Sequence, residues 1–333
     1  MKRKIAIVAG GDSSEHDVSL RSAEGILSFM DKEKYDCYIV EIRTGGNWTV
    51  FYGQEKCIVN RDDFSFNTAD GKRHNFDFAY ITIHGTPGEN GIMQGYFDLI
   101  GMPYSTSDVL VEALTFNKFA LNNFLRAFPD LHISDSIMVR KGDNITTDDE
   151  KQIAERLGIP CFVKPNAGGS SFGVTKVKYA DALRAAIDKA MVESDEVMIE
   201  KMMSGTEITC GCFKRANGDI VTLPITEVVC HDEFFDYDAK YNNKSNEITP
   251  ARIAPETAQR VSEMTKRIYH ILGCYGLIRI DYILSGEKGQ EQINMLEINT
   301  TPGMTATSFI PQQVRASEFE IKDVLSEIIE GKF

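Results

Sequence analysis

Short apolar runs alternate with helical patterns through the first hundred residues, and this alternation constrains the fold more than any other feature. Strands are expected at Lys4–Ala9 and Asp36–Arg43, with an amphipathic helix at Asp17–Met30 between them. A third strand at Asp77–Ile83 precedes a helix at Gly91–Ile100. Strands that alternate with helices in this way are typical of a parallel α/β sheet.

Two loops of this region come directly after expected strands. Gly10–Glu15 follows the first strand, and His84–Gly91 follows the third. Ligands of parallel α/β sheets bind at the carboxyl ends of strands, so both loops are candidate walls of a site. The patterns GxGxxG, GxxxxGK[ST] and HExxH are absent from the chain. The commonest dinucleotide, phosphate-loop and zinc-protease signatures are therefore excluded.

The pattern changes at about Ser107, where a mixed α+β segment begins. Helices are expected at Asn117–Phe128, Asp148–Leu157 and Asp181–Val192. Strands are expected at Ser136–Val139, Cys161–Lys164, Val174–Lys178 and Val197–Lys201.

The last third of the chain is expected to be mostly antiparallel. Asn217-Gly218 predicts a tight turn between its first two strands. A polar and aromatic stretch from Val228 to Ala254 reads as a long loop, and such loops are usually functional lids. The expected hairpins are Thr206–Lys214 with Ile220–Ile225, and Leu277–Leu284 with Gln292–Ile298; the expected helices are Pro255–Leu272 and Ser317–Glu330.

The length of 333 residues predicts two or three domains. We place them at 1–106 (α/β, substrate-binding), 107–203 (small α+β) and 204–333 (mostly antiparallel, with a lid loop at 228–254). The fold class is therefore α/β, with α+β character in the C-terminal part.

The charge balance excludes some classes of partner. The chain has 36 Lys and Arg against 49 Asp and Glu, a net charge of −13. An acidic surface repels phosphate backbones, so we expect no nucleic-acid partner. Apolar runs stay far below the ~20 residues of a membrane span, so we expect no membrane partner. The seven cysteines form no CxxC pair and are expected to be reduced thiols of a cytoplasmic protein.

The pattern GxSxG occurs once, at Gly169–Gly173. A nucleophile elbow requires a helix after the turn. Here Val174–Lys178 alternates like a strand, which argues against an esterase. A glycine- and serine-rich loop between two strands is instead expected to be a flap whose backbone N–H groups wrap phosphate oxygens.

The second C-terminal hairpin concentrates oxygen ligands on one face. Arg279 and Asp281 are two residues apart on one strand, as are Glu297 and Asn299 on its partner, and the turn brings Asp281 near Glu297. Two carboxylates and an amide oxygen suit Mg²⁺ shared with substrate phosphates. The alternative is a solvated sheet face with a salt bridge.

Two lysines are candidate phosphate ligands. Lys164 ends an apolar strand just before the glycine flap, and Lys118 opens a helix. Ammonium groups bind phosphates as point charges, although an isolated lysine is more often a surface residue. Glu200 and Glu207 flank a short segment whose backbone could read an adenine edge while a carboxylate binds ribose.

Taken in order, these motifs resemble the ATP-grasp superfamily and, more narrowly, the D-alanine–D-alanine ligase family. The resemblance spans essentially the whole chain and implies an ATP-grasp fold. Its motifs are Gly10–Ser19, His84–Gly91, Phe162–Pro165 with Gly169–Gly173, Glu200–Glu207, Phe235–Tyr241, Arg279–Asp281 and Glu297–Thr305. One departure is Asn166-Ala167-Gly168, where many relatives have a charged residue.

The resemblance implies ATP and two Mg²⁺ ions as cofactors, with Mn²⁺ as a substitute. ATP would be bound by Lys118, Lys164, Ser170, Ser171, Glu200, Lys201, Met203, Glu207 and Lys240. The metal ions would be bound by Asp281, Glu297 and Asn299.

It also implies the amino-acid sites. Glu15 and His84 would hold the first D-alanine, and Ser308 would hold the carboxylate of the second. Arg279 and the backbone N–H of Gly303 would stabilise the oxyanion. Ser170 and Tyr241 would join Glu15 in a hydrogen-bonded triad.

The implied activity is the ATP-dependent joining of two D-alanines through a D-alanyl phosphate, for peptidoglycan precursors. The implied assembly is a homodimer. Two alternatives stay open: another ATP-grasp ligase, such as a D-alanine–D-lactate ligase, and a nucleotide-binding protein without catalysis. The Lys240-Tyr241 pair favours a D-amino acid as second substrate.

Overall fold

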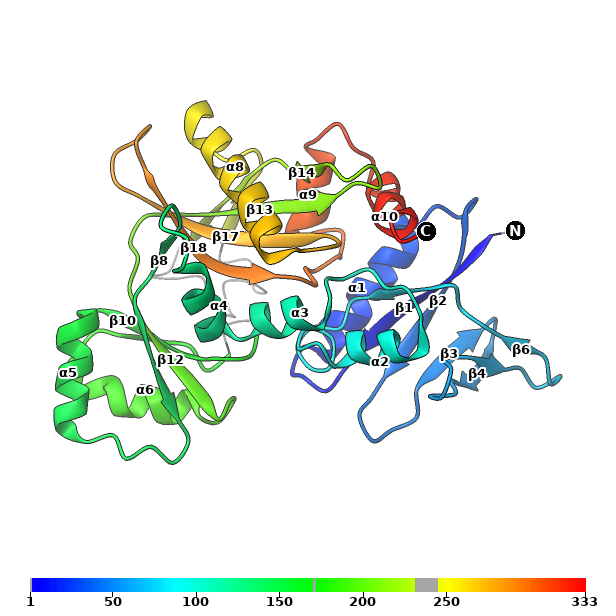
Figure 1. The fold of residues 1–333 in the computed structure, drawn as a ribbon, viewed down its shortest axis with the longest axis horizontal. Helices are drawn as coiled ribbons and strands as arrows, with labels where there is room; N and C mark the ends of the chain where they lie inside the picture. The colour runs from blue at the N-terminus through cyan, green and yellow to red at the C-terminus, as the bar shows by residue number, and fades with distance from the viewer. Residues whose placement is uncertain (1, 170–171, 231–244) are drawn as a thin grey trace.

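The computed structural model describes residues 2–169, 172–230 and 245–333. It contains an N-terminal sheet, a small sheet and a large sheet (Figure 1). In Figure 1 the N-terminal sheet, in blue, and the small sheet, in green, lie toward opposite ends of the long axis, and the large sheet crosses above them.

The N-terminal sheet has the order β4-β3-β2-β1-β7. Its strands are β1 (Arg3–Gly10), β2 (Tyr35–Ile42), β3 (Thr49–Tyr52), β4 (Glu55–Ile58) and β7 (Phe78–Ile81). β1 is parallel to β2 and β7, which confirms the predicted parallel core. The antiparallel β3 and β4 extend one edge and were not predicted. A separate short hairpin pairs β5 (Phe66–Asn67) with β6 (Arg73–His74).

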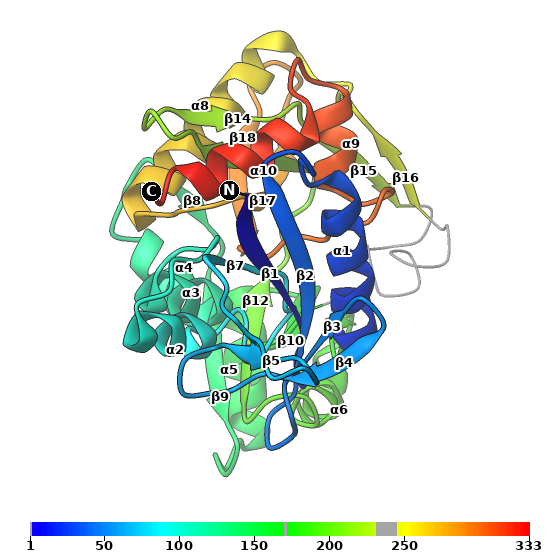
Figure 2. The same ribbon diagram turned by 90° about the vertical axis from the view of Figure 1, so that its right-hand side faces the viewer.

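Strand β1 is buried on both faces because helices cover both sides of the sheet. Ile5 and Ile7 share a core with Ile26 of α1 (His16–Phe29) and with α10 (Ile321–Glu330). Ala6 and Val8 belong to the opposite core, with α2 (Ile92–Ile100). Figure 2 shows α1 and α10 beside β1 and β2.

The small sheet is antiparallel, with the order β11-β10-β12-β9. Its core is covered by α5 and α6, and Thr146 begins α5 with a capping box to Asp149. Its elements are β9 (Ser136–Arg140), α5 (Thr147–Leu157), β10 (Cys161–Pro165), β11 (Thr175–Val177), a 3-10 turn (Ala180–Ala182), α6 (Leu183–Ala190) and β12 (Glu196–Lys201). β10 and β11 confirm that a strand, not a helix, follows the glycine flap.

The large sheet has the order β16-β15-β13-β17-β18-β8, with β14 paired to β13. Its strands are β8 (His132–Ile133), β13 (Thr206–Lys214), β14 (Ile220–Thr222), β15 (Thr226–Cys230), β16 (Ser245–Ile248), β17 (Ile278–Ser285) and β18 (Gln292–Asn299). Helix α8 (Pro255–Leu272) packs on it through Val261 and Ile268. The other helices near it are α3 (Val109–Phe116), α4 (Lys118–Leu125) and α9 (Phe309–Arg315).

Both predicted C-terminal hairpins are confirmed, but two neighbouring expectations were wrong. The stretch 228–254 is not a continuous loop, because residues 228–230 belong to β15 and Ser245–Ile248 forms β16, its antiparallel partner. The part of the predicted lid at 231–244 lies outside the described residues. The last helix begins at Ile321 rather than Ser317, and a shorter helix, α9, precedes it. The domain boundaries stay predictions; α3 and α4 follow residue 106 and pack against the core of the large sheet.

Six cysteines are free thiols: Cys37, Cys57, Cys161, Cys210, Cys212 and Cys274. Cys210 and Cys212 are fully buried on β13, as their alternation indicated. Within the described ranges, none of the helices has the length and apolar character needed to cross a membrane.

Candidate active site

Two adjoining cavities lie where the sheets meet, with volumes of about 510 and 450 Å³. The larger lies between the small and large sheets, and the smaller extends toward α1 of the N-terminal part. Both are lined by Lys118, Gly168, Gly169, Arg279, Glu297 and Phe309. The two spaces therefore share a wall of charged groups and flap backbone.

The predicted ligand face on β17 and β18 is present, and the register shifts by one residue between Tyr282 and Asp281. Asp281 lies directly opposite Glu297, and Arg279 lies opposite Asn299. The guanidinium of Arg279 donates from Nε to Asp281 Oδ1 and from Nη2 to Oδ2, both at 2.8 Å. This bidentate pair is almost fully buried. Burial opposes the charge of Arg279, but Asp281, Glu297 and Glu207 raise the pKa of the guanidinium overall.

Two further donors fix the carboxylate of Asp281. The hydroxyl of Thr209, directly across on β13, donates to Oδ1 at 2.5 Å. The side-chain amide of Asn299 donates to Oδ2 at 3.2 Å. Each oxygen of the Asp281 carboxylate therefore accepts hydrogen bonds that fix its orientation. Groups outside a coordination shell orient metal ligands in this way.

The donor chemistry of this face fits Mg²⁺. Asp281, Glu297 and Asn299 offer hard oxygen atoms on adjacent strands, and Glu297 lines both cavities. Within residues 2–169, 172–230 and 245–333, no group of three His, Cys, Asp or Glu forms a complete protein cage. Mg²⁺ usually takes one or two carboxylates and completes its shell with water and phosphate oxygens.

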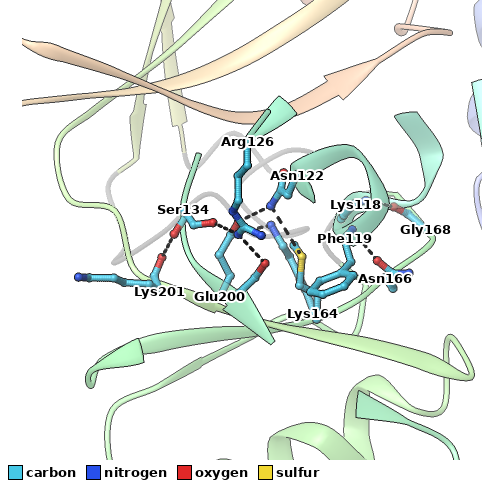
Figure 3. A network of polar contacts seen from close by, with 12 residues as sticks. Lys118, Phe119, Asn122, Arg126, Ser134, Lys164, Asn166, Gly168, Glu200 and Lys201 are labelled. Atoms are coloured by element: carbon cyan, nitrogen blue, oxygen red, sulfur yellow. Dashed lines mark hydrogen bonds and ion pairs between the residues drawn. The ribbon is translucent and has the colours of Figure 1, made fainter. Parts of the chain in front are cut away.

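Lys164 and Glu200 form a buried ion pair across β10 and β12 (Figure 3). Nζ of Lys164 lies 2.8 Å from Oε2 of Glu200, and Asn122 donates to the other carboxylate oxygen at 3.2 Å. Sheet register explains the contact, because Lys164 pairs with Met198, two residues from Glu200. The two residues predicted to bind phosphate and nucleoside are thus in direct contact.

Lys118 is attached to the beginning of the flap. Its Nζ donates to the carbonyl of Gly168 at 2.7 Å, and its backbone N–H donates to the carbonyl of Asn166. Asn166 is fully buried and accepts from the N–H of Phe119 at 2.8 Å. Figure 3 shows these contacts beside the Lys164–Glu200 pair. Asn166, where the sequence departs from many relatives, therefore connects α4 to the flap through hydrogen bonds.

The remaining predicted nucleotide residues line the larger cavity. Lys201, Met203 and Glu207 contribute to the wall next to Glu200. The side chain of Lys201 points away from the Lys164–Glu200 pair in Figure 3, while its carbonyl accepts from Ser134 at 2.7 Å. Four predicted residues lie outside the described residues: Ser170, Ser171, Lys240 and Tyr241.

The smaller cavity brings Glu15, His84 and Glu89 together. His84 is buried and lies 3.3 Å from the hydroxyl of Ser22, and burial lowers the pKa of its imidazole. Glu89 accepts from the N–H of Gly85 at 2.6 Å. Burial, followed by the charge of Glu15, raises the pKa of Glu89 to about 7.

The flap reaches this cavity through Gly169. A Cβ atom at that position would lie 2.2 Å from Oε2 of Glu15, so the glycine backbone packs directly against the carboxylate. The other end of the cavity is formed by Gly303 and Ser308. The hydroxyl of Ser308 accepts from the N–H of Thr305 at 3.1 Å.

Two family models match the chain. The description "D-ala D-ala ligase N-terminus" matches residues 4–107, and "D-ala D-ala ligase C-terminus" matches residues 126–330. A relative from Phocaeicola vulgatus, named D-alanine--D-alanine ligase, is 61% identical over 335 residues and is covered over 100% of both chains.

The chain belongs to the D-alanine–D-alanine ligase family. Another family member with the same name, from Bacteroides fragilis, is 58% identical over the full length of both chains. Among solved structures, the VanG D-Ala:D-Ser ligase of Enterococcus faecalis superposes with a TM-score of 0.86 at 28% identity over 100% of both chains. The Bacillus anthracis D-alanine--D-alanine ligase complexed with ATP gives 0.76 at 28% identity, over 99% of this chain and 97% of that one.

For this family member, sequence reasoning missed several residues that support the site. Asn122, Asn166 and Thr209 are buried and bond directly to predicted residues or their neighbours. Thr209 had a usable signal, since it alternates with the buried Ile208 and Cys210 on a strand of the same sheet. Asn122 and Asn166 had none, because their partners are distant in the chain.

Proposed function

We propose that this chain joins two D-alanine molecules to D-alanyl-D-alanine, with conversion of ATP to ADP and phosphate. One observation carries the proposal: the buried Arg279–Asp281 pair lies opposite Glu297 and Asn299, in the wall shared by the two cavities. A cation and hard oxygen ligands at that junction suit phosphoryl transfer between a nucleotide and a carboxylate. The product would serve peptidoglycan precursor synthesis.

The first step activates a carboxylate, because a carboxylate oxygen is a poor leaving group. The first D-alanine would lie in the smaller cavity, with its ammonium at Glu15 and with His84 beside it. Its carboxylate would then point toward the shared wall and receive the terminal phosphoryl group of ATP. Lys118 and Lys164 would neutralise phosphate charge, since such transfer depends mainly on positioning and charge stabilisation.

Asp281, Glu297 and Asn299 would hold two Mg²⁺ ions, for which Mn²⁺ could substitute. When bound, the ions would neutralise phosphate oxygens and hold them in line. Thr209 and Arg279 keep the carboxylate of Asp281 oriented toward that role.

The second step forms the peptide bond. The amine of the second D-alanine would attack the D-alanyl phosphate while Ser308 holds its carboxylate. The developing oxyanion would be stabilised by Arg279 and the N–H of Gly303. Arg279 is held in place by two hydrogen bonds to Asp281, and such preorganised donors are worth most in a buried site.

The decisive experiment is ADP release by the purified full chain with ATP, Mg²⁺ and D-alanine, with dipeptide measured in parallel. Equal amounts of ADP and dipeptide are expected, with neither product from L-alanine. D-Lactate and D-serine are tested as second substrates to separate a depsipeptide or D-alanine–D-serine ligase. ATP binding without ADP release in any mixture would overturn the proposal in favour of a nucleotide-binding protein.

We further propose a cytoplasmic homodimer. The reaction uses ATP, which supports a cytoplasmic location. Light scattering of the purified chain tests the dimer, which predicts about twice the chain mass of 37.3 kDa.

A further inference from the structure

One carboxylate of the smaller cavity has no role in the scheme above. Glu247 lies on β16, opposite Val228 of β15, and lines this cavity together with Arg279, Gly303 and Ser308. These are the groups assigned to the oxyanion and to the second amino acid. Glu247 is therefore at the acceptor end, whereas Glu15 is at the donor end.

The side chain of Glu247 is held in place by α9. Nε2 of Gln312 donates to Oε2 of Glu247 and also to the carbonyl of Thr307, the latter at 2.7 Å. Gln312 lies one helical turn after Ser308, and its backbone N–H donates to the Ser308 carbonyl. The carboxylate is thus fixed relative to the residue that would bind the acceptor carboxylate.

The electrostatic surroundings leave Glu247 available for a cation. Within the described residues, Arg279 is the charged group that lowers its pKa, and the two form no salt bridge there. Arg279 is already engaged by both oxygens of Asp281. Other charged or titratable groups of the cavity are Glu15, Arg21, His84, Glu89, Lys118 and Glu297. On neighbouring elements, Glu227 is paired with Arg252, and Arg315 donates to the carbonyl of Ala306.

The acceptor amino acid presents a chemical problem that this placement addresses. A free amino acid near neutral pH carries an ammonium group, which has no lone pair for attack. One proton must leave before the nitrogen can bond to the acyl carbon. Arginine and lysine cations cannot take that proton, and His84 lies beside the donor group Glu15.

We propose that Glu247 binds the ammonium group of the acceptor amino acid and accepts its first proton. This inference depends on the ligase function proposed above. The ammonium passes one proton to the Glu247 carboxylate and becomes a neutral amine. Its lone pair forms the C–N bond, and the carbon–oxygen bond to phosphate breaks with its electron pair on the departing phosphate. The second proton leaves the nitrogen to that phosphate.

The surroundings of Glu247 make it a better base than an exposed carboxylate. Burial raises its pKa, while the hydrogen bond from Gln312 and the charge of Arg279 lower it. A base becomes more effective as its pKa approaches the working pH.

The test is Glu247→Gln, assayed with two different acceptors. The amide oxygen of glutamine can still accept from Gln312, but the side chain cannot take a proton. With D-alanine as acceptor, dipeptide formation is expected to fall about 10²-fold, the lower range for loss of a general base. With hydroxylamine, which is largely neutral at pH 7, D-alanyl hydroxamate formation is expected to stay unchanged. Dipeptide formation by the variant should also recover about tenfold per pH unit, as free amine accumulates.

The outcomes separate a basic role from a structural one. Loss of dipeptide with unchanged hydroxamate, and with recovery at high pH, supports the proposal. Equal loss of both products would overturn it, because that result indicates disturbed geometry of the shared site. Unchanged dipeptide formation at all pH values would overturn it as well.

A second variant tests the proposal independently if Glu247→Gln does not fold. Gln312→Leu keeps the carboxylate but removes the hydrogen bond that lowers its pKa. The acid limb of the dipeptide pH profile should then move to higher pH, with hydroxamate formation unmoved. An unshifted acid limb would contradict the proposal. Glu256→Gln, at an exposed glutamate of α8, is the matched control for loss of one charge.

The native chain distinguishes this inference from the proposed function. If the native chain releases no ADP with D-alanine, the ligase proposal fails. If the native chain makes dipeptide and both Glu247→Gln and Gln312→Leu behave like it at every pH, only the role of Glu247 fails.

Discussion

Arg279 and Asp281 form a bidentate ion pair within one strand, with both nitrogen–oxygen distances at 2.8 Å. Side chains two residues apart on a strand share a face, so the sequence itself brings them together. The group proposed to stabilise the oxyanion thus also orients a proposed metal ligand.

Arg279→Ala should reduce dipeptide formation by about 10²–10³-fold, the usual effect of losing one oxyanion donor. Arg279→Lys keeps the charge but not the two parallel hydrogen bonds, and should recover only part of the rate. Steady-state kinetics with D-alanine measure both variants. Near-normal turnover of Arg279→Ala would show that the oxyanion assignment is wrong.

Thr209→Val tests the support of Asp281 without removing a proposed ligand. Valine has a similar shape but cannot donate to Oδ1, so the Asp281 carboxylate loses one of the hydrogen bonds that orient it. Loss of such an outer-shell partner typically weakens metal binding about 10–100-fold. Mn²⁺ binding, followed by electron paramagnetic resonance, should show this change. Thr222→Val, on neighbouring β14, is the control, and equal affinities in the two variants would contradict the prediction.

Lys164→Met should destabilise the fold as well as weaken ATP binding. The change leaves the Glu200 carboxylate buried without its cation, and breaking a buried pair typically costs about 3–5 kcal/mol. Urea unfolding gives the free energy of unfolding. Lys141→Met is the comparison, because the Lys141–Asp195 pair is exposed and surface pairs contribute little. Similar losses of stability in both variants would exclude a special role for burial.

Gly169→Ala should impair binding of the first amino acid more than binding of ATP. The added methyl group would lie 2.2 Å from Oε2 of Glu15, so the flap or the carboxylate must move. KM for the first D-alanine should rise, while ATP affinity measured by calorimetry changes little. Gly95→Ala is the control, since its Cβ would meet the nearest atom at an ordinary 3.7 Å.

Glu89 should make stability depend on pH. Its pKa is raised from 4.5 to about 7 in the folded chain, mainly by burial, so the folded state keeps its proton where the unfolded state has lost it. The stabilising contribution is fully present below about pH 4.5 and is lost as pH rises to about 7, a change of about 3 kcal/mol.

Urea unfolding at several pH values tests this expectation. The stability difference between the native chain and Glu89→Gln should shrink from pH 4.5 to 7 and then stay constant. Glu24→Gln, at an exposed position of α1, should show no such trend. A pH-independent difference for Glu89→Gln would exclude a raised pKa.

Local patterns predicted those parts of the fold and site that depend on residues close in sequence. The hairpin spacing predicted that Asp281 lies near Glu297. Their exact pairing depends on a register shift between Asp281 and Tyr282, which the spacing does not predict. The alternation of strands with helices along the chain likewise predicted the parallel sheet around β1.

Such local patterns could not predict contacts between segments that are distant in the chain. The Lys164–Glu200 pair depends on the register of β10 and β12, which are separated by β11 and α6 in the chain. β15 and β16 were hidden in a polar stretch because each is short and lies toward the edge of the sheet. Short strands carry too few alternating residues to stand out from a loop.

The wall that the two cavities share has a consequence for inhibitor design. Both spaces are lined by Arg279, Glu297 and the flap residues Gly168 and Gly169. With ATP proposed for the larger cavity and D-alanine for the smaller, a single molecule with an adenine-like head and an amino-acid-like tail would occupy both. Linking the two parts makes the second contact intramolecular, with an effective concentration of about millimolar for a short flexible linker. Such a compound would gain affinity without any new contact to the protein.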